Sequence, residues 1–233
     1  MSFLETARPA ESASPALERV FLKATFAWMF LGLALTTAIA AWFGADASMM
    51  DAVRQRPGLM LAAVVAQIAV VLLLAFAINR ISSTTAMFLF VLYAALTGAV
   101  FAVLLGYYST SSIAMAFAGA TGVFAGMAAW GYFTERDLSG LGPVLFGALI
   151  GFLVASVVFV FTGGAVFNLV LGFIGVVLFA ALTAYDIQQI KRYAATAMDE
   201  ESARKAAIFG ALQLYLDFVN LFVSLLRIFG SSR

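Results

Sequence analysis

The longest stretch without a charged side chain runs from Ile81 to Thr134 and reads ISSTTAMFLFVLYAALTGAVFAVLLGYYSTSSIAMAFAGATGVFAGMAAWGYFT. A membrane-spanning helix needs about 20 consecutive apolar residues, so these 54 residues are long enough for two spans and a turn. The turn is expected at 106–111, GYYSTS, where glycine and hydroxyl-bearing residues interrupt the aliphatic run. The stretch therefore predicts two helices that cross a membrane.

The other apolar segments predict five further spans. Runs 24–45 and 57–79 fit one span each, and run 138–185 fits two with a break at Thr162-Gly163-Gly164. The segment Ala206–Leu226 is apolar apart from Asp217 and predicts a seventh span. Residues 1–19 are expected to be a polar, disordered and uncleaved cytoplasmic tail, and residues 20–233 a single transmembrane domain. Its spans are expected at about 21–43, 58–79, 86–106, 112–132, 143–161, 166–190 and 206–228.

The composition of the whole chain supports this all-α membrane architecture and excludes many functions. Apolar residues make up 64% of the 233 residues and charged residues 11%, whereas soluble domains are about half apolar. The chain contains no cysteine and no histidine, which excludes disulfides, Cys/His zinc sites, haem histidines and Ser-His triads. A net charge of +1 without a basic block predicts no nucleic-acid binding. No catalytic residue and no cofactor are predicted, and the surrounding partner is membrane lipid.

Basic residues predict how the chain is oriented in the membrane. With seven alternating spans, nine Lys and Arg residues fall on the side of the N-terminus and four on the opposite side. Cytoplasmic loops carry the excess of basic residues. We therefore expect a multi-pass protein of the cell inner (plasma) membrane with a cytoplasmic N-terminus.

Three ionisable residues lie within or at the end of predicted spans, where each costs at least about 2.5–3.5 kcal/mol at mid-bilayer and needs a partner or a purpose. Arg80 closes the second span, Asp186 lies late in the sixth, and Asp217 lies near the middle of the seventh. Snorkelling of Arg80 to lipid headgroups is an open alternative to a role inside the bundle.

The seventh span carries a polar stripe that cannot face lipid. Its polar residues recur at offsets of four, three, four and three, which places them on one face of an α-helix. The helix is therefore predicted to be central, with this face turned to the bundle interior or to an aqueous cavity. Structural hydrogen bonding to neighbouring helices is the alternative role of the stripe. The stripe consists of Gln213, Asp217, Asn220, Ser224 and Arg227.

Small and amide side chains in other spans are assigned to packing. Gly122 with Gly126, and Gly147 with Gly151, form small-xxx-small pairs that let helix backbones approach closely. We expect them to pack within the bundle, and the same pattern also serves dimers. Gln67, in the middle of the second span, is expected to serve helix packing and not ligand binding.

Asp186 and Asp217 are the candidate functional pair. Two carboxylates that converge away from water cannot easily both ionise unless a cation or Arg80 compensates them. Such a pair would respond to protons and to cations. Calcium prefers carboxylate and carbonyl oxygens, so both aspartates are candidate calcium contacts.

Two motifs in the last third of the chain resemble the Bax inhibitor family, the transmembrane Bax inhibitor motif proteins, in its bacterial branch. They are ALTAYDIQQIKR (Ala181–Arg192) and LQLYLDFVNLFVSLLRIFG (Leu212–Gly230). Supporting similarity lies in INRISSTTAMFLFVLYAALTG (Ile78–Gly98) and FTERDLSGLGPVLFGALIG (Phe133–Gly151). The likeness extends from about Val20 to the end of the chain.

This resemblance implies six helices around a central seventh and a calcium leak that pH controls through a paired-aspartate sensor. The family's sensor aspartates fall on Asp186 and Asp217, and its second-helix arginine, which pairs with them in the closed state, falls on Arg80. The resemblance thus implies calcium as the transported ion and protons as the regulator.

Other functions remain open at this stage. An intramembrane aspartyl protease also uses a Tyr-Asp and a second aspartate to activate water, and Tyr185-Asp186 fits, but no Gly-x-Gly precedes Asp217. A proton-coupled secondary transporter would show an inverted repeat, which is not visible. A retinal-binding pump lacks its lysine inside the seventh span. A scaffold that regulates other membrane proteins is a further alternative.

Overall fold

A computed structural model describes residues 15–78, 80–196 and 200–230 of the chain. Those residues form eight α-helices and one short 3-10 helix, without a strand. Seven of the helices are long and apolar enough to cross a membrane, so the predicted all-α membrane fold with seven spans is confirmed. The helices are α1 (Pro15–Ala45), α2 (Ala47–Gln55), α3 (Pro57–Ala77), α4 (Ser83–Leu105), α5 (Thr110–Phe133), η1 (Ser139–Leu141), α6 (Gly142–Thr162), α7 (Ala165–Thr196) and α8 (Glu200–Phe229).

Local sequence signals end the spans where breaks were predicted. In the longest apolar run, α4 ends at Leu105, and Ser109 caps α5 by accepting a hydrogen bond from the Ser112 N–H at 3.2 Å. Between α6 and α7, Gly163 and Gly164 have φ angles of 64° and 104°, which glycine adopts without a steric penalty. Of the tail predicted at 1–19, residues 1–14 lie outside the described residues, whereas 15–19 begin α1, so the prediction of disorder is wrong for those five residues.

The short helix α2 was not predicted. It follows the first span directly, because Asp46 accepts hydrogen bonds from the Ser48 and Met49 N–H groups at 2.9 and 3.3 Å and caps its first turn. A hydrogen bond from the Ser48 hydroxyl lowers the pKa of the Asp46 carboxyl most, and the two backbone bonds lower it further. Pro57 then begins α3. Counting charge-free runs cannot find a nine-residue helix between two spans.

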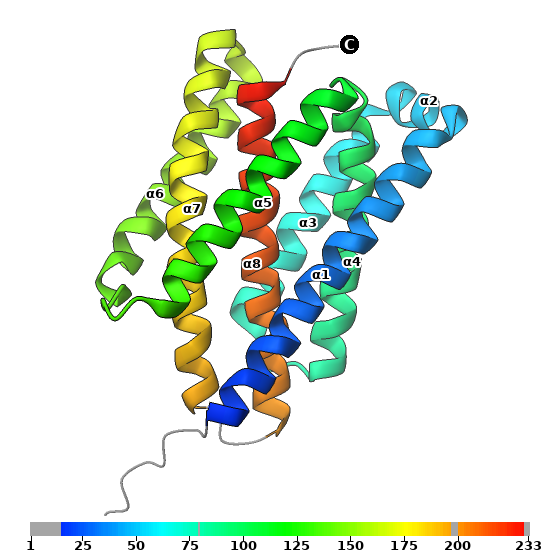
Figure 1. Cartoon of the computed structure of the whole chain (residues 1–233). Coiled ribbons are helices and arrows are strands. Elements are labelled where there is room, and N and C mark those ends of the chain that lie inside the picture. Colours follow the sequence, from blue (N-terminus) through cyan, green and yellow to red (C-terminus); the bar gives the residue numbers. More distant parts are fainter. Residues whose placement is uncertain (1–14, 79, 197–199, 231–233) are drawn as a thin grey trace, which may run out of the picture.

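The spanning helices run up and down through the molecule, so that α1 begins at one end and α8 finishes at the other (Figure 1). We call the end at which α1 begins the N-terminal side. Helix α8 packs against α1, α4, α5 and α7, whereas α3 packs chiefly on α4 and α6 chiefly on α7. The expectation that six helices surround the seventh is therefore not confirmed in that form.

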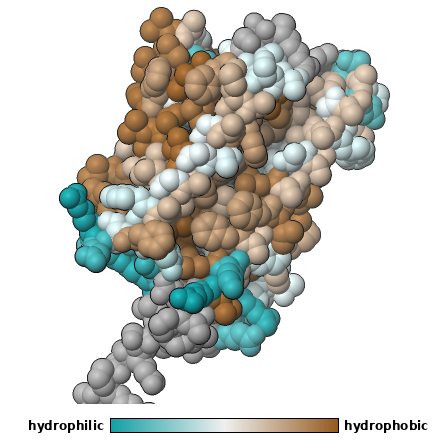
Figure 2. Space-filling view, in the orientation of Figure 1, coloured by the Kyte–Doolittle hydropathy of each residue, from teal (hydrophilic) through white to brown (hydrophobic). Residues whose placement is uncertain are grey.

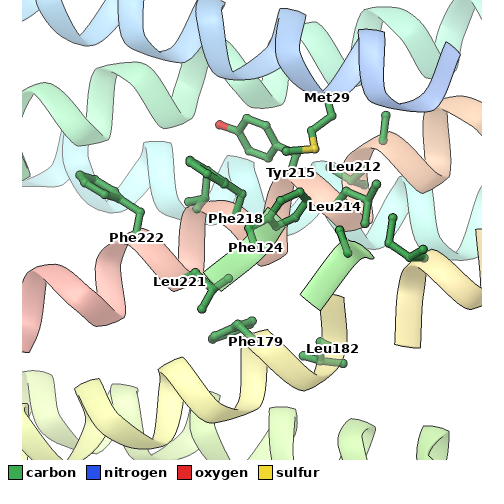
Figure 3. Close-up of a cluster of buried hydrophobic side chains, with 14 of the residues drawn as sticks. Met29, Phe124, Phe179, Leu182, Leu212, Leu214, Tyr215, Phe218, Leu221 and Phe222 are labelled. Atoms are coloured by element: carbon green, nitrogen blue, oxygen red, sulfur yellow. The ribbon is translucent and has the colours of Figure 1, made fainter. Parts of the chain in front are cut away.

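Helix α8 is nevertheless the most buried of the spans. Of its most apolar stretch 67% is buried, against at most 33% for any other spanning helix. Figure 3 shows apolar side chains from α1, α5 and α7 converging on it, with Tyr215 near the centre. Tyr215 is fully buried, its hydroxyl lies 2.6 Å from Thr36 Oγ1, and its ring makes edge contacts with Phe90 and Tyr93 at 5.8 Å each. These contacts hold α8 against α1 and α4.

The outer surface has the polarity expected of a membrane protein. Figure 2 shows apolar residues over most of the visible face, with hydrophilic residues at its lower end and around α2. Helix α6 is apolar on all sides, and only 6% of the residues in its most apolar stretch are buried inside the structure. Phe146, Val157 and Phe161 are among its exposed side chains. A helix of this kind is stable with its surface in lipid.

Glycines at other positions than those predicted bring the helices together. A Cβ on Gly122, Gly126, Gly147 or Gly151 would meet nothing within 4 Å, so the predicted packing role of these pairs within the chain is wrong. By contrast, a Cβ on Gly131 of α5 would lie 2.8 Å from the Ala184 Cα of α7. Periodicity alone does not tell which face of an apolar helix meets a neighbour.

Gln67 joins two helices, in agreement with the packing role predicted for it. Its Nε2 donates to Thr97 Oγ1 of α4 at 2.9 Å, and Thr97 donates in turn to the Tyr93 carbonyl at 2.9 Å. The amide thus joins α3 to α4 inside the apolar region.

Candidate functional site

The candidate site lies where α7 and α8 run antiparallel beside each other. Asp186 lies six residues before Arg192, about 9 Å of helix rise from that end of the apolar region. Asp217 lies twelve residues after Lys205, about 18 Å of rise from the same end. The antiparallel pairing places both acids between the two helices, with Asp186 towards the N-terminal side and Asp217 near the middle of its span.

The structure brings the two predicted acids into contact. Asp186 and Asp217 are 6% and 4% exposed, and their carboxyl groups lie within hydrogen-bonding reach of each other. Gln213 Nε2 donates to Asp186 Oδ1 at 3.4 Å. Thr183, one turn before Asp186, lies near Asp217, and its hydroxyl donates to the Phe179 carbonyl at 2.7 Å. Apart from each other, the two acids thus have uncharged neighbours, Gln213 and Thr183.

Some of the oxygens in this site have no partner. Among the described residues, Asp217 Oδ2 and Gln213 Oε1 are buried without a hydrogen bond. Buried polar atoms are normally satisfied by protein, water or an ion. Two ionised carboxylates that lie next to each other, away from water, would repel each other strongly. The site is therefore suited to hold a proton between the acids or to receive a cation.

Arg80 is not part of this contact. It follows α3 with an exposed side chain, and its backbone N–H donates to the Ala77 carbonyl at 2.8 Å. Within the described ranges, no hydrogen bond or ion pair joins its guanidinium to either aspartate. Its pairing with the acids in another state remains a prediction.

The polar stripe of α8 faces helices α6 and α7. Gln213 meets Asp186, and Ser224 fills the space that a Cβ on Gly175 of α7 would need. Arg227 reaches α6, where its guanidinium carbon lies 5.9 Å from the ring centre of Phe152 and 5.8 Å from that of Phe159. Its stem is close to Gly172 of α7. Asn220 differs, because its Nδ2 donates to the Leu216 carbonyl of its own helix at 2.8 Å.

At the end of the stripe opposite Gln213, another buried polar atom lacks a hydrogen-bond partner. Arg227 Nη1 is buried without a hydrogen bond in the described part of the chain, and so is Ser156 Oγ on the α6 face between Phe152 and Phe159. Unsatisfied polar atoms thus occur at both ends of the stripe, at Gln213 and Asp217 and again at Arg227. Most of the predicted stripe is turned towards α6 and α7, away from lipid.

Residues just after Asp186 anchor a loop that sequence reasoning had not connected to the site. Gln188 accepts from the Leu138 N–H and donates to the Arg136 carbonyl, each at 2.8 Å. Lys191 donates to the Tyr132 carbonyl at 2.8 Å and lies 4.4 Å from that ring centre. In the sequence, the polar run QQIKR at the end of an apolar span is the feature that could have indicated this attachment.

An ion pair completes this attachment. Arg192 pairs with Asp137 in the loop between α5 and η1. The backbone N–H and hydroxyl of Ser139, followed by Arg192, lower the pKa of Asp137 to about 2. The end of α7 that carries Asp186 is thereby fixed to the α5–α6 connection at neutral pH.

The site contains few metal ligands. No group of three or more acidic side chains gathers among the described residues. The oxygens on offer are those of Asp186, Asp217 and Gln213, all of the hard type that calcium prefers. Calcium normally takes six to eight oxygens, more than these three side chains supply.

The fold and the site define a polytopic α-helical membrane protein with a buried carboxyl pair between its last two spans. The chain belongs to the Bax inhibitor family: the family described as "Inhibitor of apoptosis-promoting Bax1" matches residues 18–233. It is 39% identical over 218 residues to inner membrane protein YbhL of Escherichia coli K12, covering 92% of this chain and 93% of that protein. An uncharacterized protein of Deinococcus radiodurans is 41% identical over 215 residues, 92% and 91% of the two chains. One of Borreliella burgdorferi is 34% identical over 218 residues, 93% and 94% of the two chains.

Proposed function

We propose that this chain is a pH-sensitive calcium leak channel of the bacterial inner membrane, with its N-terminal side in the cytoplasm. Membership of the Bax inhibitor family and similarity to an inner membrane protein support the location. The observation that carries the proposal is the contact between Asp186 and Asp217, two nearly buried carboxyl groups on adjacent spans.

The closed state depends on a single proton shared by the pair. One carboxylic acid then donates to one carboxylate, a charge-assisted bond that joins α7 to α8. Hydrogen bonds of this type contribute about 1.5–3 kcal/mol, which corresponds to roughly a tenfold to hundredfold shift of an equilibrium. Removing the proton replaces attraction by repulsion, and adding a second proton removes the ionic component. Either change favours separation of the two helices.

The same oxygens interact with the permeating ion. When both acids are ionised, Asp186, Asp217 and the unpartnered Gln213 Oε1 present oxygen ligands to a cation. The polar face of α8 continues from there towards Arg227, away from the lipid. Arg80, at the N-terminal side, would compensate the pair in a closed state in which it turns inwards.

The test is calcium flux into liposomes that contain the purified chain and an enclosed calcium dye, measured from pH 5 to 8. Asp186→Asn and Asp217→Asn keep the side-chain size but cannot share a proton in the same way. Each should flatten the pH profile of the leak. Glu135→Gln is the matched control, because Glu135 is an exposed acid in the loop after α5, and its profile should equal that of the wild type.

Other outcomes would favour other functions. If both aspartate variants keep the wild-type flux and pH profile, the leak mechanism is wrong. Cleavage of a helical substrate that either substitution abolishes, without ion flux, would favour the intramembrane aspartyl protease. Solute uptake that requires a proton gradient and moves protons in fixed proportion would favour a proton-coupled transporter.

A further inference from the structure

A large cavity lies on the side of α8 that faces away from the acid pair. It has a volume of about 730 Å³ and is bounded by α1, α2, α4, α5 and α8. Phe218, Val219 and Phe222 form its wall on α8, whereas Asp217 and Ser224 face α7. Figure 1 shows α1 and α5 at the front of the molecule, with α8 behind α5. The cavity is thus distinct from the candidate site.

The position of the cavity along the helices matches one leaflet of a bilayer. On α1 its lining extends from Leu33 to Ala45, about 18 Å of helix rise. The hydrocarbon core is about 30 Å thick, so one leaflet accounts for about half of that. The lining on α4 and α5 lies next to the connection between these helices, at residues 101–106 and 110–117. The cavity therefore lies in the leaflet opposite the N-terminal side.

The lining of the cavity is largely apolar, and the hydroxyls in it already have partners. It is formed mostly by aliphatic and aromatic side chains, with three threonine hydroxyls. Thr36 bonds to the Ala94 carbonyl and to Tyr215, and Thr37 donates to the Leu33 carbonyl at 2.8 Å. Thr110, the third, is not free either. A buried water needs two to four polar partners, so the cavity is suited to an apolar occupant.

The rim of the cavity resembles the boundary between lipid tails and headgroups. Met50 of α2 lines the cavity and lies close to Gly106 at the end of α4. Asp51 and Gln55 of the same helix are exposed. A short helix with one apolar and one polar face lies at a membrane interface. Helix α2 therefore places its apolar face over the cavity and its polar face at the level of the headgroups.

We propose that this cavity binds an acyl chain of a phospholipid from the leaflet opposite the N-terminal side, with the headgroup beside α2. The cavity volume falls within the range of about 300–1,000 Å³ that is typical of small-molecule sites. Phospholipid is the apolar molecule that surrounds an opening at this depth. The acyl chain of the lipid packs against Phe218 and Phe222 and holds α8 in place from the side opposite the acid pair.

The test is retention of lipid by the full chain. The protein is reconstituted in vesicles of phosphatidylethanolamine and phosphatidylglycerol, extracted in mild detergent, washed, and examined by native mass spectrometry. Wild type should retain one phospholipid per chain. Ala41→Phe with Ala114→Phe fills the opening from α1 and α5, both positions being exposed in the lining, and should reduce retention at least tenfold. Ala118→Phe, one turn further along α5 and outside the lining, is the matched control and should retain the lipid.

A second measurement uses the unaltered protein and does not depend on folding of the filled variant. A phospholipid with a photoreactive acyl chain should crosslink to residues 33–45 of α1, 110–117 of α5 or 218–222 of α8. Crosslinks spread over the exposed faces of α3 and α6 would overturn the proposal. So would retained lipid in the folded double variant at the wild-type level, absence of phospholipid from wild type, or retention of a different apolar molecule.

Discussion

The closest approach of two helix backbones near the acid pair provides a quantitative prediction. Gly131 of α5 faces the backbone of Ala184 in α7, two residues before Asp186. A Cβ on Gly131 would lie 2.8 Å from the Ala184 Cα and 2.9 Å from its carbonyl carbon, whereas ordinary contacts begin at 3.4 Å. The Ala184 carbonyl oxygen would be closer still, so Gly131→Ala must move α5 and α7 apart by about 1 Å to restore an ordinary contact, because a backbone cannot rotate away as a side chain can.

The magnitude follows from comparison with a second glycine of the same helix. Replacing glycine by alanine inside a helix raises the free energy of unfolding by up to about 1 kcal/mol through helix propensity alone. Gly126→Ala should show this increase in stability, because its Cβ meets nothing within 4 Å. Overpacking costs about 1–3 kcal/mol. Since propensity cancels between the two variants, Gly131→Ala should be less stable than Gly126→Ala by about 1–3 kcal/mol.

The assay is reversible unfolding in mixed micelles with increasing denaturing detergent. Equal free energies of unfolding for the two alanine variants would refute the inferred contact between α5 and α7. The flux assay adds a functional measurement on the same samples. Displacement of α7 beside Asp186 should also alter the pH profile of the leak in Gly131→Ala, while Gly126→Ala keeps the wild-type profile.

Three further predictions concern residues around the pair. Ionised Asp137, held first by Ser139 and then by Arg192, contributes stability that is complete above the unfolded pKa of Asp, about 3.9, and is lost as pH falls towards its folded pKa of about 2. Its contact with Arg192 therefore does not titrate between pH 5 and 8, so Arg192→Gln should leave the shape of the leak profile in that range unchanged, and a shifted profile would assign that ion pair a role in sensing. Arg80→Ala should raise the basal leak at neutral pH if this arginine compensates the acids in a closed state, and an unchanged leak would assign it to lipid headgroups. Gln67→Leu removes the bond to Thr97 and should lower the free energy of unfolding by about 0.6 kcal/mol, the typical value for such bonds in membranes; a loss above about 2 kcal/mol would indicate a larger role.

The parts of the fold that could be predicted are those that the bilayer imposes. Seven spans follow from the gaps between charges, since a charge inside lipid is costly and the backbone must form helices there. The contact of Asp186 with Asp217 could be anticipated for the same reason, because a carboxyl at mid-membrane needs a partner. The antiparallel order of two consecutive spans places both acids in the interior half of the bundle, but counting helix rise puts them about 9 Å apart in depth, so their contact itself had to come from the structure.

The parts that could not be predicted depend on which face of each apolar helix meets a neighbour. Gly126 and Gly131 lie in one helix, yet only Gly131 contacts another backbone. In a helix that is apolar all round, no polar face distinguishes lipid from protein. Arg80 is similar, since a basic residue at a span end can lie inside or outside the bundle. The attachment of the α5–α6 loop by Gln188 and Arg192 requires the three-dimensional arrangement of loops far apart in the sequence.

The most direct test of the acid pair is the calcium leak of the double variant Asp186→Asn/Asp217→Asn, measured across pH in the same liposomes as the two single variants. If the acids act as one unit that shares a proton, the first substitution already removes the pH response. The double variant should then show the same flat profile, within about twofold of the single variants in rate. If the effects of the two substitutions instead multiply, each acid acts independently and a shared-proton gate is contradicted.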